Sequence, residues 1–400
     1  LDTSSDFSPG TTHYYKVQAL NDFYGDTDFS ETVSISTTPV VTAAWHDLGS
    51  VGFAAAEGEI ELASMGGNLY ALFADAADLD KRIKAMKHDE NDTGSWSNAG
   101  TYLSLAAAGS DEVSALVSGS TLYAAYADTD VSVTSGGSPA VFVKQYSGTA
   151  WSSVGAADGL TTYDAGEFGV WGTDPVLTNG TSGPFAAYVT DSFGIINTLS
   201  YTGSGLYWDE ENTDYWTTNT LSAAELGLAT DITGRHIAAL QSGGGLSNPT
   251  TNMYRFESGF WTPYGSEFII GSADGFLYTH GFLCDDLNNL YLAAEKLSSG
   301  SQEACDVFIS SGGAWSSLDL SAQITTPATY LDLAIVENAD SSGIFAAASL
   351  QDSGSYWVEL WEYSGAAWQQ IGDAVSSTVG ALSVDVAIDS SSRPILILAE

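Results

Sequence analysis

The stretch YSGAAWQQIG, residues 363–372, joins the end of a strand-like run to a tryptophan through a short turn of small residues. Three related stretches occur elsewhere: VKQYSGTAWSSVG at 143–155, MYRFESGFWTPYG at 253–265 and VFISSGGAWSSLD at 307–319. In each, Gly and Ser mark a turn between two strand-like runs. The recurrence indicates a chain built from repeats, and a repeat determines how every other segment is interpreted.

Two markers alternate along the whole chain. One is the tryptophan; the other is an aromatic or aliphatic residue followed by small or apolar residues, as in NLYALF at 68–73. Each marker occurs seven times, and successive copies of the second lie 50 to 62 residues apart. The tryptophans are Trp45, Trp96, Trp151, Trp216, Trp261, Trp315 and Trp368, and the second markers are Tyr70, Tyr123, Phe185, Ile237, Tyr291, Phe345 and Ile395.

Each repeat holds about four strand-like runs, and no stretch has the sustained apolar spacing of a long helix. Runs such as YALF and FAAY are apolar on both faces, which suits strands that are covered on both sides. This period and strand content are typical of a β-propeller. We therefore expect an all-β fold with a seven-bladed β-propeller over residues 40–400. An array of β-sandwiches is the alternative, although each such module needs ~100 residues.

The two ends of the repeat predict how the ring closes. It opens with a lone tryptophan strand at 43–49 and finishes with a single hairpin at 382–399. We expect these segments to share the closing blade, because such a clasp protects the edges of the first and last strands. One strand of that blade is unaccounted for, so either the blade is short or the chain continues beyond residue 400.

Residues 1–39 do not share the repeat. SPGTTHYYKVQALNDFYGDTDFSETVSISTTP, residues 8–39, resembles the last two strands of a fibronectin type III domain. His13 stands where that family usually has its corner tyrosine. The resemblance implies an incomplete β-sandwich, which cannot bury its apolar face alone. The matching positions are Phe7, Pro9, Gly10, Thr11, Tyr15, Val17, Ala19 and Asn21.

The Ser-Gly-x-x-Trp turns resemble the Asp-box of sialidase-type propellers, Ser-x-Asp-x-Gly-x-x-Trp, but the aspartate is missing from every copy. In that family the box is structural, so the resemblance implies blade architecture and no catalytic role. Sialidase-type chemistry also needs a clamp of three arginines. The chain has four, in scattered contexts: Arg82, Arg235, Arg255 and Arg393.

The composition excludes several partners. Ten Lys and Arg stand against 50 Asp and Glu, which gives a formal net charge of −40. Nucleic acids and anionic membranes are poor partners because phosphate binding needs cationic side chains. No run of 18 apolar residues is present, so we expect no membrane span. The basic run KRIKAMK at 81–87 could be a docking patch or a solvated strand and turn.

The third repeat is the longest, and its extra residues suggest a binding loop. Tyr207, Trp208, Tyr215 and Trp171 could form a platform for sugar stacking. The acidic residues beside them could ligate Ca²⁺ through oxygen atoms. Ca²⁺ is the only cofactor that the sequence suggests. A solvated acidic loop is the alternative, because no EF-hand spacing is present. The candidate ligands are Asp209, Glu210, Glu211 and Asp214.

Other residues are assigned no catalytic role. The five histidines are far apart and lack zinc-site spacing. Fifty acidic residues make a close carboxylate pair unavoidable by chance, and nothing in the sequence singles one out. Cys284 and Cys305 fall near opposite ends of one predicted blade, beyond the ~7 Å Cα separation that a disulfide allows. We therefore predict two separate, mostly buried thiols.

These features favour a non-enzymatic protein of a prokaryotic cell surface or the extracellular space, which binds a glycan or a protein or serves as a scaffold. The alternative is a carbohydrate-active propeller enzyme, a glycosidase or lyase. A carboxylate pair in the central channel with one strongly raised pKa would favour the enzyme. A third hypothesis is self-assembly through unpaired edges of the N-terminal strands.

Overall fold

The computed structural model describes about two thirds of the chain. The described residues are 12–15, 33–36, 45–48, 52–91, 94–104, 108–128, 140–155, 172–180, 183–190, 195–201, 208–210, 226–242, 250–257, 260–265, 268–269, 277–298, 301–311, 314–324, 328–339, 343–377 and 383–399. They form two compact units, Leu1–Trp45 and His46–Glu400. This boundary lies about six residues after the one expected from the sequence.

Within these ranges, the second unit contains six antiparallel sheets in which consecutive strands pair as a meander, and we call these blades 1 to 6. Blade 1 comprises β3 (Ala56–Met65), β4 (Asn68–Asp75), β5 (Ile83–Asp89) and β6 (Ser97–Asn98). Blade 2 comprises β7 (Ala108–Ser118), β8 (Thr121–Asp128), β9 (Ala140–Tyr146) and β10 (Trp151–Ser153). Blade 3 comprises β11 (Gly172–Asn179), β12 (Pro184–Thr190), β13 (Ile195–Tyr201) and β14 (Trp208–Glu210).

Blades 4 and 6 each have a short fifth strand that pairs with the third strand. Blade 4 comprises β15 (Leu226–Thr230), β16 (His236–Ser242), β17 (Thr250–Glu257), β18 (Phe260–Pro263) and β19 (Phe268–Ile269). Blade 5 comprises β20 (Leu277–Cys284), β21 (Leu290–Ser298), β22 (Ser301–Ser311) and β23 (Ala314–Ser317). Blade 6 comprises β24 (Thr329–Glu337), β25 (Ile344–Asp352), β26 (Ser355–Tyr363), β27 (Trp368–Gln370) and β28 (Val375–Ser377).

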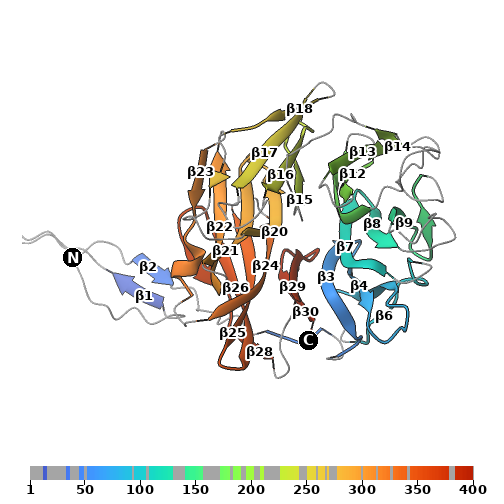
Figure 1. Ribbon diagram of the computed structural model, residues 1–400. Coiled ribbons are helices and arrows are strands. Elements are labelled where there is room, and N and C mark those ends of the chain that lie inside the picture. The colour runs from blue at the N-terminus through green and yellow to red at the C-terminus, as the bar shows by residue number, and fades with distance from the viewer. Residues whose placement is uncertain are drawn as a thin grey trace, which may run out of the picture. The chain divides into compact units, whose positions relative to one another are not determined.

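The sheets are arranged around a common centre, as Figure 1 shows, and the fold is a β-propeller. The first strand of each blade lies innermost and contacts the first strands of its neighbours. A two-stranded sheet of β29 (Ser383–Ile388) and β30 (Pro394–Ala399) lies between blades 6 and 1, where β29 contacts both β24 and β3. The expectation of seven blades is therefore not confirmed. In the described part of the chain six blades are complete, and the last repeat contributes only its hairpin.

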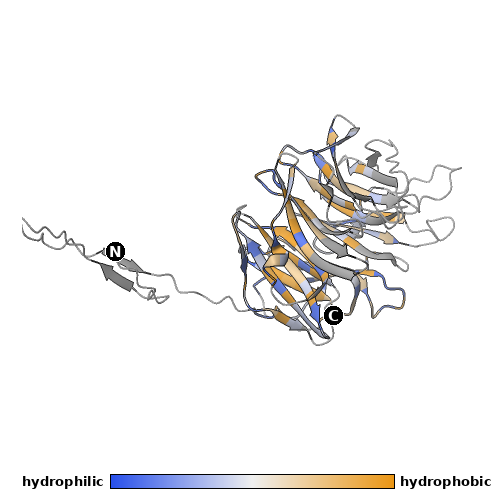
Figure 2. Ribbon diagram, turned by 60° about the vertical axis from the view of Figure 1, so that its left-hand side comes forward, coloured by the Kyte–Doolittle hydropathy of each residue, from blue (hydrophilic) through white to orange (hydrophobic). Residues whose placement is uncertain are grey.

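Apolar side chains pack mainly between adjacent sheets. The second strands β4 and β8 are buried along almost their whole length, as predicted for apolar runs such as YALF in β4. One core cluster joins blades 1 and 2, and another joins the β29–β30 sheet to blade 1. Figure 2 shows hydrophobic residues along the strands of this unit. The blades are thus stabilised by stacking on each other, which is the property expected of propeller repeats.

The first strands approach each other closely. A Cβ placed on Gly227 of β15 would lie 2.6 Å from the Cβ of Phe282 in β20. Real Cβ atoms do not come that close, so a side chain at this position would force neighbouring strands apart. Glycine at this position therefore permits the close packing at the centre of the ring.

In three repeats the tryptophan links its blade to the preceding repeat through a backbone carbonyl, whereas the indole of Trp261 donates to the Thr198 hydroxyl of blade 3 at 3.2 Å. The indole Nε1 of Trp151 donates to the carbonyl of Ala99 at 2.7 Å, and that of Trp368 donates to the carbonyl of Leu318 at 2.8 Å. Trp96 likewise donates to the carbonyl of Leu48 at 3.0 Å. Each of these three carbonyl acceptors lies three residues after the tryptophan of the preceding repeat. Leu48 therefore presents to blade 1 the carbonyl that an outer strand presents in the complete blades.

The unit Leu1–Trp45 contains a two-stranded antiparallel sheet of β1 (Thr12–Tyr15) and β2 (Val33–Ser36). These strands fall inside the segment that resembles a fibronectin type III domain, and the resemblance itself stays a prediction. Residues 45–48 are not in a strand. The other residues of the proposed clasp at 43–49 lie outside the described part of the chain, so the clasp also stays a prediction.

The only helix among the described residues is a 3-10 turn, η1 (Leu320–Ala322). No helix in the described ranges is long and apolar enough to cross a membrane.

Candidate functional site

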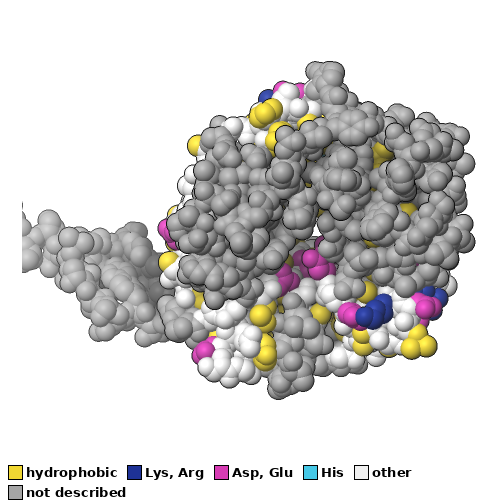
Figure 3. Space-filling view, in the orientation of Figure 1, with side chains coloured by type: hydrophobic (Ala, Val, Ile, Leu, Met, Phe, Trp, Pro, Cys, Tyr) yellow, Lys and Arg dark blue, Asp and Glu magenta, His cyan; other side chains and the backbone are white. Residues whose placement is uncertain are grey.

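The inner strands carry a series of acidic side chains that were not among the candidate residues predicted from the sequence. Asp332 lies on β24, Asp385 on β29 and Glu61 on β3, so they come from three consecutive sheets around the centre. All three side chains are half-buried. In Figure 3 acidic side chains gather around the central hollow of the ring.

Each of these carboxylates binds a backbone N–H of the next sheet. Asp332 Oδ2 accepts a hydrogen bond from the Val384 N–H at 2.8 Å, and Asp385 Oδ2 accepts one from the Leu62 N–H at 2.6 Å. Glu61 in turn accepts a bond from the backbone N–H of Ala115 in blade 2. The carboxylates therefore connect four consecutive sheets.

The same series continues without charge. The hydroxyl oxygen of Ser114 in β7 accepts a hydrogen bond from the Leu177 N–H of blade 3 at 3.1 Å. Charge is thus not required for this contact between sheets. The acidic members of the series differ from Ser114 in that they can hold protons, because half-buried carboxylates near each other resist losing all their protons.

The pKa values of Asp385 and Glu61 are raised. Burial is the main cause that raises the pKa of Asp385 to about 7; the N–H bonds lower it, and the carboxylates of Asp332 and Glu59 raise it. Burial also raises the pKa of Glu61 well above its ordinary value, and the negative charge of Asp385 is the next cause. Near neutral pH the pair therefore retains a proton.

A second recurrent feature is the turn between the first two strands of a sheet. In blade 4, Asp231 Oδ1 accepts the N–H groups of Thr233 and Arg235 at 2.9 Å, and Oδ2 accepts Arg235 Nε at 2.7 Å. Asp389 with Arg393 forms the same arrangement between β29 and β30. Burial raises the pKa of Asp231, but these hydrogen bonds outweigh it and leave the pKa below its ordinary value.

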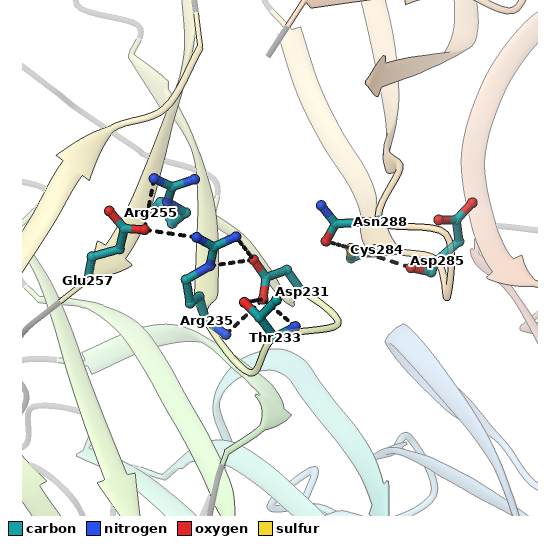
Figure 4. Close-up of polar contacts among 8 residues, drawn as sticks. All are labelled: Asp231, Thr233, Arg235, Arg255, Glu257, Cys284, Asp285 and Asn288. Carbon is teal, nitrogen blue, oxygen red and sulfur yellow. Dashed lines mark hydrogen bonds and ion pairs between the residues drawn. The ribbon is translucent and has the colours of Figure 1, made fainter. Parts of the chain in front are cut away.

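Figure 4 shows how the turns of blades 4 and 5 present their polar groups. Arg235 lies between Asp231 and Glu257, with its Nη1 2.9 Å from Glu257 Oε1. Arg255 binds the same oxygen at 2.8 Å, so two guanidinium groups share one carboxylate. Burial raises the pKa of the neighbouring Cys284 thiol to about 12, and nearby carboxylates add to the shift. That thiol is therefore protonated at neutral pH and is not an activated nucleophile.

Each of the four arginines of the chain is engaged in an ion pair with Asp or Glu. The basic run at 81–87 is also partly neutralised. Lys81 pairs with Glu57, and Lys84 Nζ lies 3.0 Å from Asp75 Oδ2. Arg82 pairs with Asp78 and stacks over the ring of Tyr102 at 4.1 Å. These pairings give no support to a clamp of three arginines for a carboxylate ligand.

The residues predicted to bind sugar or Ca²⁺ are only partly within the described chain. Trp208, Asp209 and Glu210 form the outer strand β14 and pair with Tyr201, Ser200 and Leu199. Tyr207, Tyr215, Trp171, Glu211 and Asp214 lie outside the described residues. The described ranges contain no group of three or more His, Cys, Asp or Glu side chains placed to hold a metal ion. The loop site stays a prediction.

The prediction of two separate thiols is confirmed. Cys284 and Cys305 are both free, the first half-buried and the second buried. In the register of blade 5, Cys284 pairs with Leu290 and Cys305 with Glu295. Five residues of β21 therefore separate them, a distance of roughly 17 Å along a strand.

The sequence does contain a signal for the inner carboxylates. Asp332 and Asp385 stand between apolar residues in YLDLAI and SVDVAI, and Glu61 stands likewise in EIELAS. An acidic residue inside an apolar strand, at a similar place in three repeats, is a buried charge that needs a partner. The turn aspartates could have been found in the same way, from the spacing in DITGR and DSSSR.

Comparison with solved structures supports the propeller fold. The chain resembles an ulvan lyase, from a new family of polysaccharide lyases, bound to -[GlcA(1-4)Rha3S]-, with a TM-score of 0.55, 9% identity, and coverage of 88% of this chain and 93% of that one. It also resembles AofleA from Arthrobotrys oligospora, with a TM-score of 0.50, 12% identity, and coverage of 86% and 89%. At such identities the likeness concerns the fold alone. No protein-family model and no curated protein sequence matches the chain.

Proposed function

We propose that the protein is a non-enzymatic binding module of the cell surface or extracellular space, and that its ligand is a glycan without anionic groups. The observation that supports this most is the state of the charged side chains. All four arginines pair with carboxylates of the protein itself, and the inner carboxylates accept backbone N–H groups. Among the described residues every arginine is thus engaged by a carboxylate of the protein, and few cationic groups remain to bind an anionic ligand.

The net charge of −40 supports a neutral ligand in particular. Polyanionic polysaccharides would be repelled at low ionic strength, whereas neutral sugars bind through aromatic stacking and uncharged hydrogen bonds. Trp208 and its aromatic neighbours in sequence remain the residues that we propose for stacking. The place of Trp208 on the outer strand of blade 3 would put the ligand at the rim and leave the central channel free.

An array of neutral, cationic and sulfated glycans, probed with the full chain at two salt concentrations, tests this proposal. Neutral glycans should bind at both concentrations, and Trp208→Ala should weaken that binding by about tenfold or more, as loss of a stacking residue does. Tyr356→Ala, an aromatic truncation in blade 6, should leave it unchanged. Binding confined to sulfated glycans, or no binding to any glycan, would contradict the proposal.

A carbohydrate-active enzyme is the second candidate, and the proton held by Glu61 and Asp385 favours it. A carboxyl group with a raised pKa beside an ionisable partner is the arrangement that acid catalysis of glycosidic bond cleavage uses. New reducing ends or unsaturated products, measured on a panel of polysaccharides, would support this candidate. If the activity survives in both Glu61→Gln and Asp385→Asn, the catalysis does not depend on these two carboxyl groups.

We further propose that the ring has seven members, with the β29–β30 sheet as the inner half of the last one. The bond from Trp96 to the Leu48 carbonyl supports this, since Leu48 takes the role that Ala99 and Leu318 take in complete blades. Self-assembly through the N-terminal strands, with or without Ca²⁺, is a separate proposal. Light scattering and electron microscopy on the full chain test it, and a stable monomer under both conditions would exclude it.

A further inference from the structure

The second strand of the last sheet differs from the second strands of the complete blades. In blades 1 to 6 each second strand pairs with another strand along both of its edges. Among the described residues, β30 pairs only with β29. The described chain therefore leaves the outer edge of β30, where a complete blade has its third strand, without a partner strand.

The side chains of β30 are those of a strand that is covered on all sides. Its sequence, PILILA, has no charged and no polar side chain. Ile397 and Ala399 pack against blade 1, but Ile395, Leu396 and Leu398 are only half-buried. The equivalent strands β4 and β8 are buried at every position except the first. A third strand beside β30 would bury this remaining apolar surface and would bond the outward N–H and C=O groups.

The position of this edge restricts what can reach it. β29 meets β3 of blade 1 at a seam and contacts β24 and β25 of blade 6 on its other side. The third and fourth strands of both neighbouring blades lie further from the centre than β30, because strands follow one another outward within a blade. The carbonyl of Leu48 already takes the place of an outer strand beside Trp96. One strand position therefore remains between β30 and Leu48, and only a segment as thin as a single strand fits it.

Charge distinguishes between the possible donors of that strand. The chain has a formal net charge of −40, so two copies repel each other. The sheet itself carries Asp385 and Asp389, and its one basic residue, Arg393, is paired with Asp389. Glu90 of blade 1 accepts the Ser390 N–H beside them at 3.0 Å. A segment without acidic residues, from a different protein, therefore suits this edge better than a second copy does.

We propose that the outer edge of β30 is an acceptor for an extended segment of a partner protein, apolar, free of acidic residues and about as long as β30. The segment adds antiparallel to β30 as the third strand of the last sheet. In such strand addition, backbone hydrogen bonds supply affinity and alternating side chains supply specificity. The inference rests on the proposal that the β29–β30 sheet is the inner half of a seventh member, and it is independent of the glycan proposal.

The probe for a test is a fluorescent synthetic peptide with the sequence of β9, AVFVKQY, which is a third strand of this chain without acidic residues. It should bind the full chain saturably, in the micromolar range, and gain fluorescence anisotropy. A peptide with Val143→Pro should bind at least about tenfold more weakly, because proline lacks the N–H and interrupts the strand.

A pair of protein variants locates the binding edge. Leu396→Lys should weaken binding of the unaltered peptide by at least about tenfold, because a charge on an edge strand opposes pairing. Leu287→Lys is the matched control, since Leu287 is exposed in a turn of blade 5, and it should bind the peptide as the wild type does. Neither change touches the residues proposed to bind glycans, so glycan binding should be unchanged in both variants.

Amide hydrogen exchange of the wild type with excess peptide tests the site even if Leu396→Lys does not fold. Exchange should slow at least about tenfold at 394–399 and stay unchanged at 121–128, where β8 already has both neighbours. Exchange at 46–48 should also slow, because the added strand would lie beside these residues. Slowing at 394–399 without slowing at 46–48 would support the acceptor edge and contradict only the seven-member ring.

Two results would overturn the proposal. One is the absence of saturable peptide binding, or binding that leaves exchange at 394–399 unchanged. The other is a dimer or polymer of the full chain that the peptide dissociates, because a second copy would then supply the strand. Light scattering with and without the peptide detects that second case.

Discussion

The carboxylate of Asp231 shows how much a single residue can contribute to a blade. It is buried, it accepts bonds from two backbone N–H groups and the Thr233 hydroxyl, and it pairs with Arg235. These contacts close the turn between β15 and β16. The aspartates at 285 and 389 form equivalent turns, so the residue type is structural in at least three repeats.

We expect Asp231→Ala to destabilise the protein by about 2–4 kcal/mol, because it removes several hydrogen bonds and leaves Arg235 without its buried partner. Urea unfolding followed by tryptophan fluorescence measures the change. Asp80→Ala is the matched control, since Asp80 is exposed. A difference of less than about 0.5 kcal/mol between the two variants would show that the turn forms without its carboxylate.

His236 should remain neutral well below pH 6. It is buried, its ring stacks on Phe185 at 3.7 Å, and burial lowers its pKa to about 4. The unfolded chain binds a proton on this residue near pH 6.5. Stability should therefore fall as pH decreases from about 6.5 to 4, by up to about 3 kcal/mol.

The pH titration of the His236 ring protons by NMR tests this prediction directly. A histidine in a short unstructured peptide serves as the reference. A midpoint for His236 close to 6.5 would contradict the prediction, because it would show that the folded protein accommodates the charged ring. Equilibrium unfolding at about pH 7 and about pH 4.5, with His236→Gln beside the wild type, isolates the contribution of this residue.

At the scale of elements, the tryptophan strand serves to connect blades. We expect Trp368→Phe to destabilise the protein by about 2–3 kcal/mol, because the buried indole loses both its bond to the Leu318 carbonyl and packing volume. Trp357→Phe, whose indole donates to Glu359 of the same strand, should cost less than about 1.5 kcal/mol. Thermal unfolding of both variants gives the comparison. Equal losses would mean that the link between blades adds nothing beyond aromatic burial.

The strands themselves were largely predictable from the sequence. Their period, turn residues and apolar runs predicted strand pairs in every repeat, because these properties depend on local backbone geometry and burial. The hydrogen bond from Trp96 to Leu48 was not predictable, because it depends on how neighbouring repeats are positioned relative to each other. The acids at 61, 332 and 385 carry a local signal, an acidic residue inside an apolar strand, which was not used. Their N–H partners lie on another sheet, and no local pattern reveals those contacts.

At the scale of the whole molecule, net charge should control stability. A formal charge of −40 on one chain produces strong self-repulsion, which salt screens. We expect the melting temperature to rise by several degrees between about 10 mM and 500 mM NaCl, with KCl equally effective. Differential scanning calorimetry measures this rise.

Calcium serves as a discriminating control for that experiment. Screening alone needs millimolar concentrations of divalent cation, whereas occupation of a binding loop stabilises at lower concentrations through mass action. Asp209→Asn with Asp214→Asn should remove any stabilisation seen below the millimolar range. No rise in melting temperature with NaCl would contradict the view that unscreened repulsion limits stability.

The seventh blade is the part of the predicted architecture that is not confirmed. Seven markers of each kind suggested seven blades, and the 382–399 hairpin was expected to form part of the last one. In the described chain six blades are complete, and the last repeat supplies the two-stranded sheet of β29 and β30. Each marker is a single residue of a repeat, so the number of markers does not show that every repeat contains all its strands. Ring closure depends on contacts between the two ends of the repeat array, and the clasp expected between 43–49 and 382–399 stays a prediction.

The seam between β29 and β3 also determines the order in which the molecule can fold. Blades 1 to 6 form from contacts within about 50 residues, whereas the bond from Leu62 to Asp385 spans 323. Contacts of that range form slowly, because a long chain segment must be ordered first. During synthesis the inner edge of blade 1 therefore stays exposed until nearly the whole ring has been made. Closure of the seam should be the last and slowest step of folding, and the step most open to pairing with another chain.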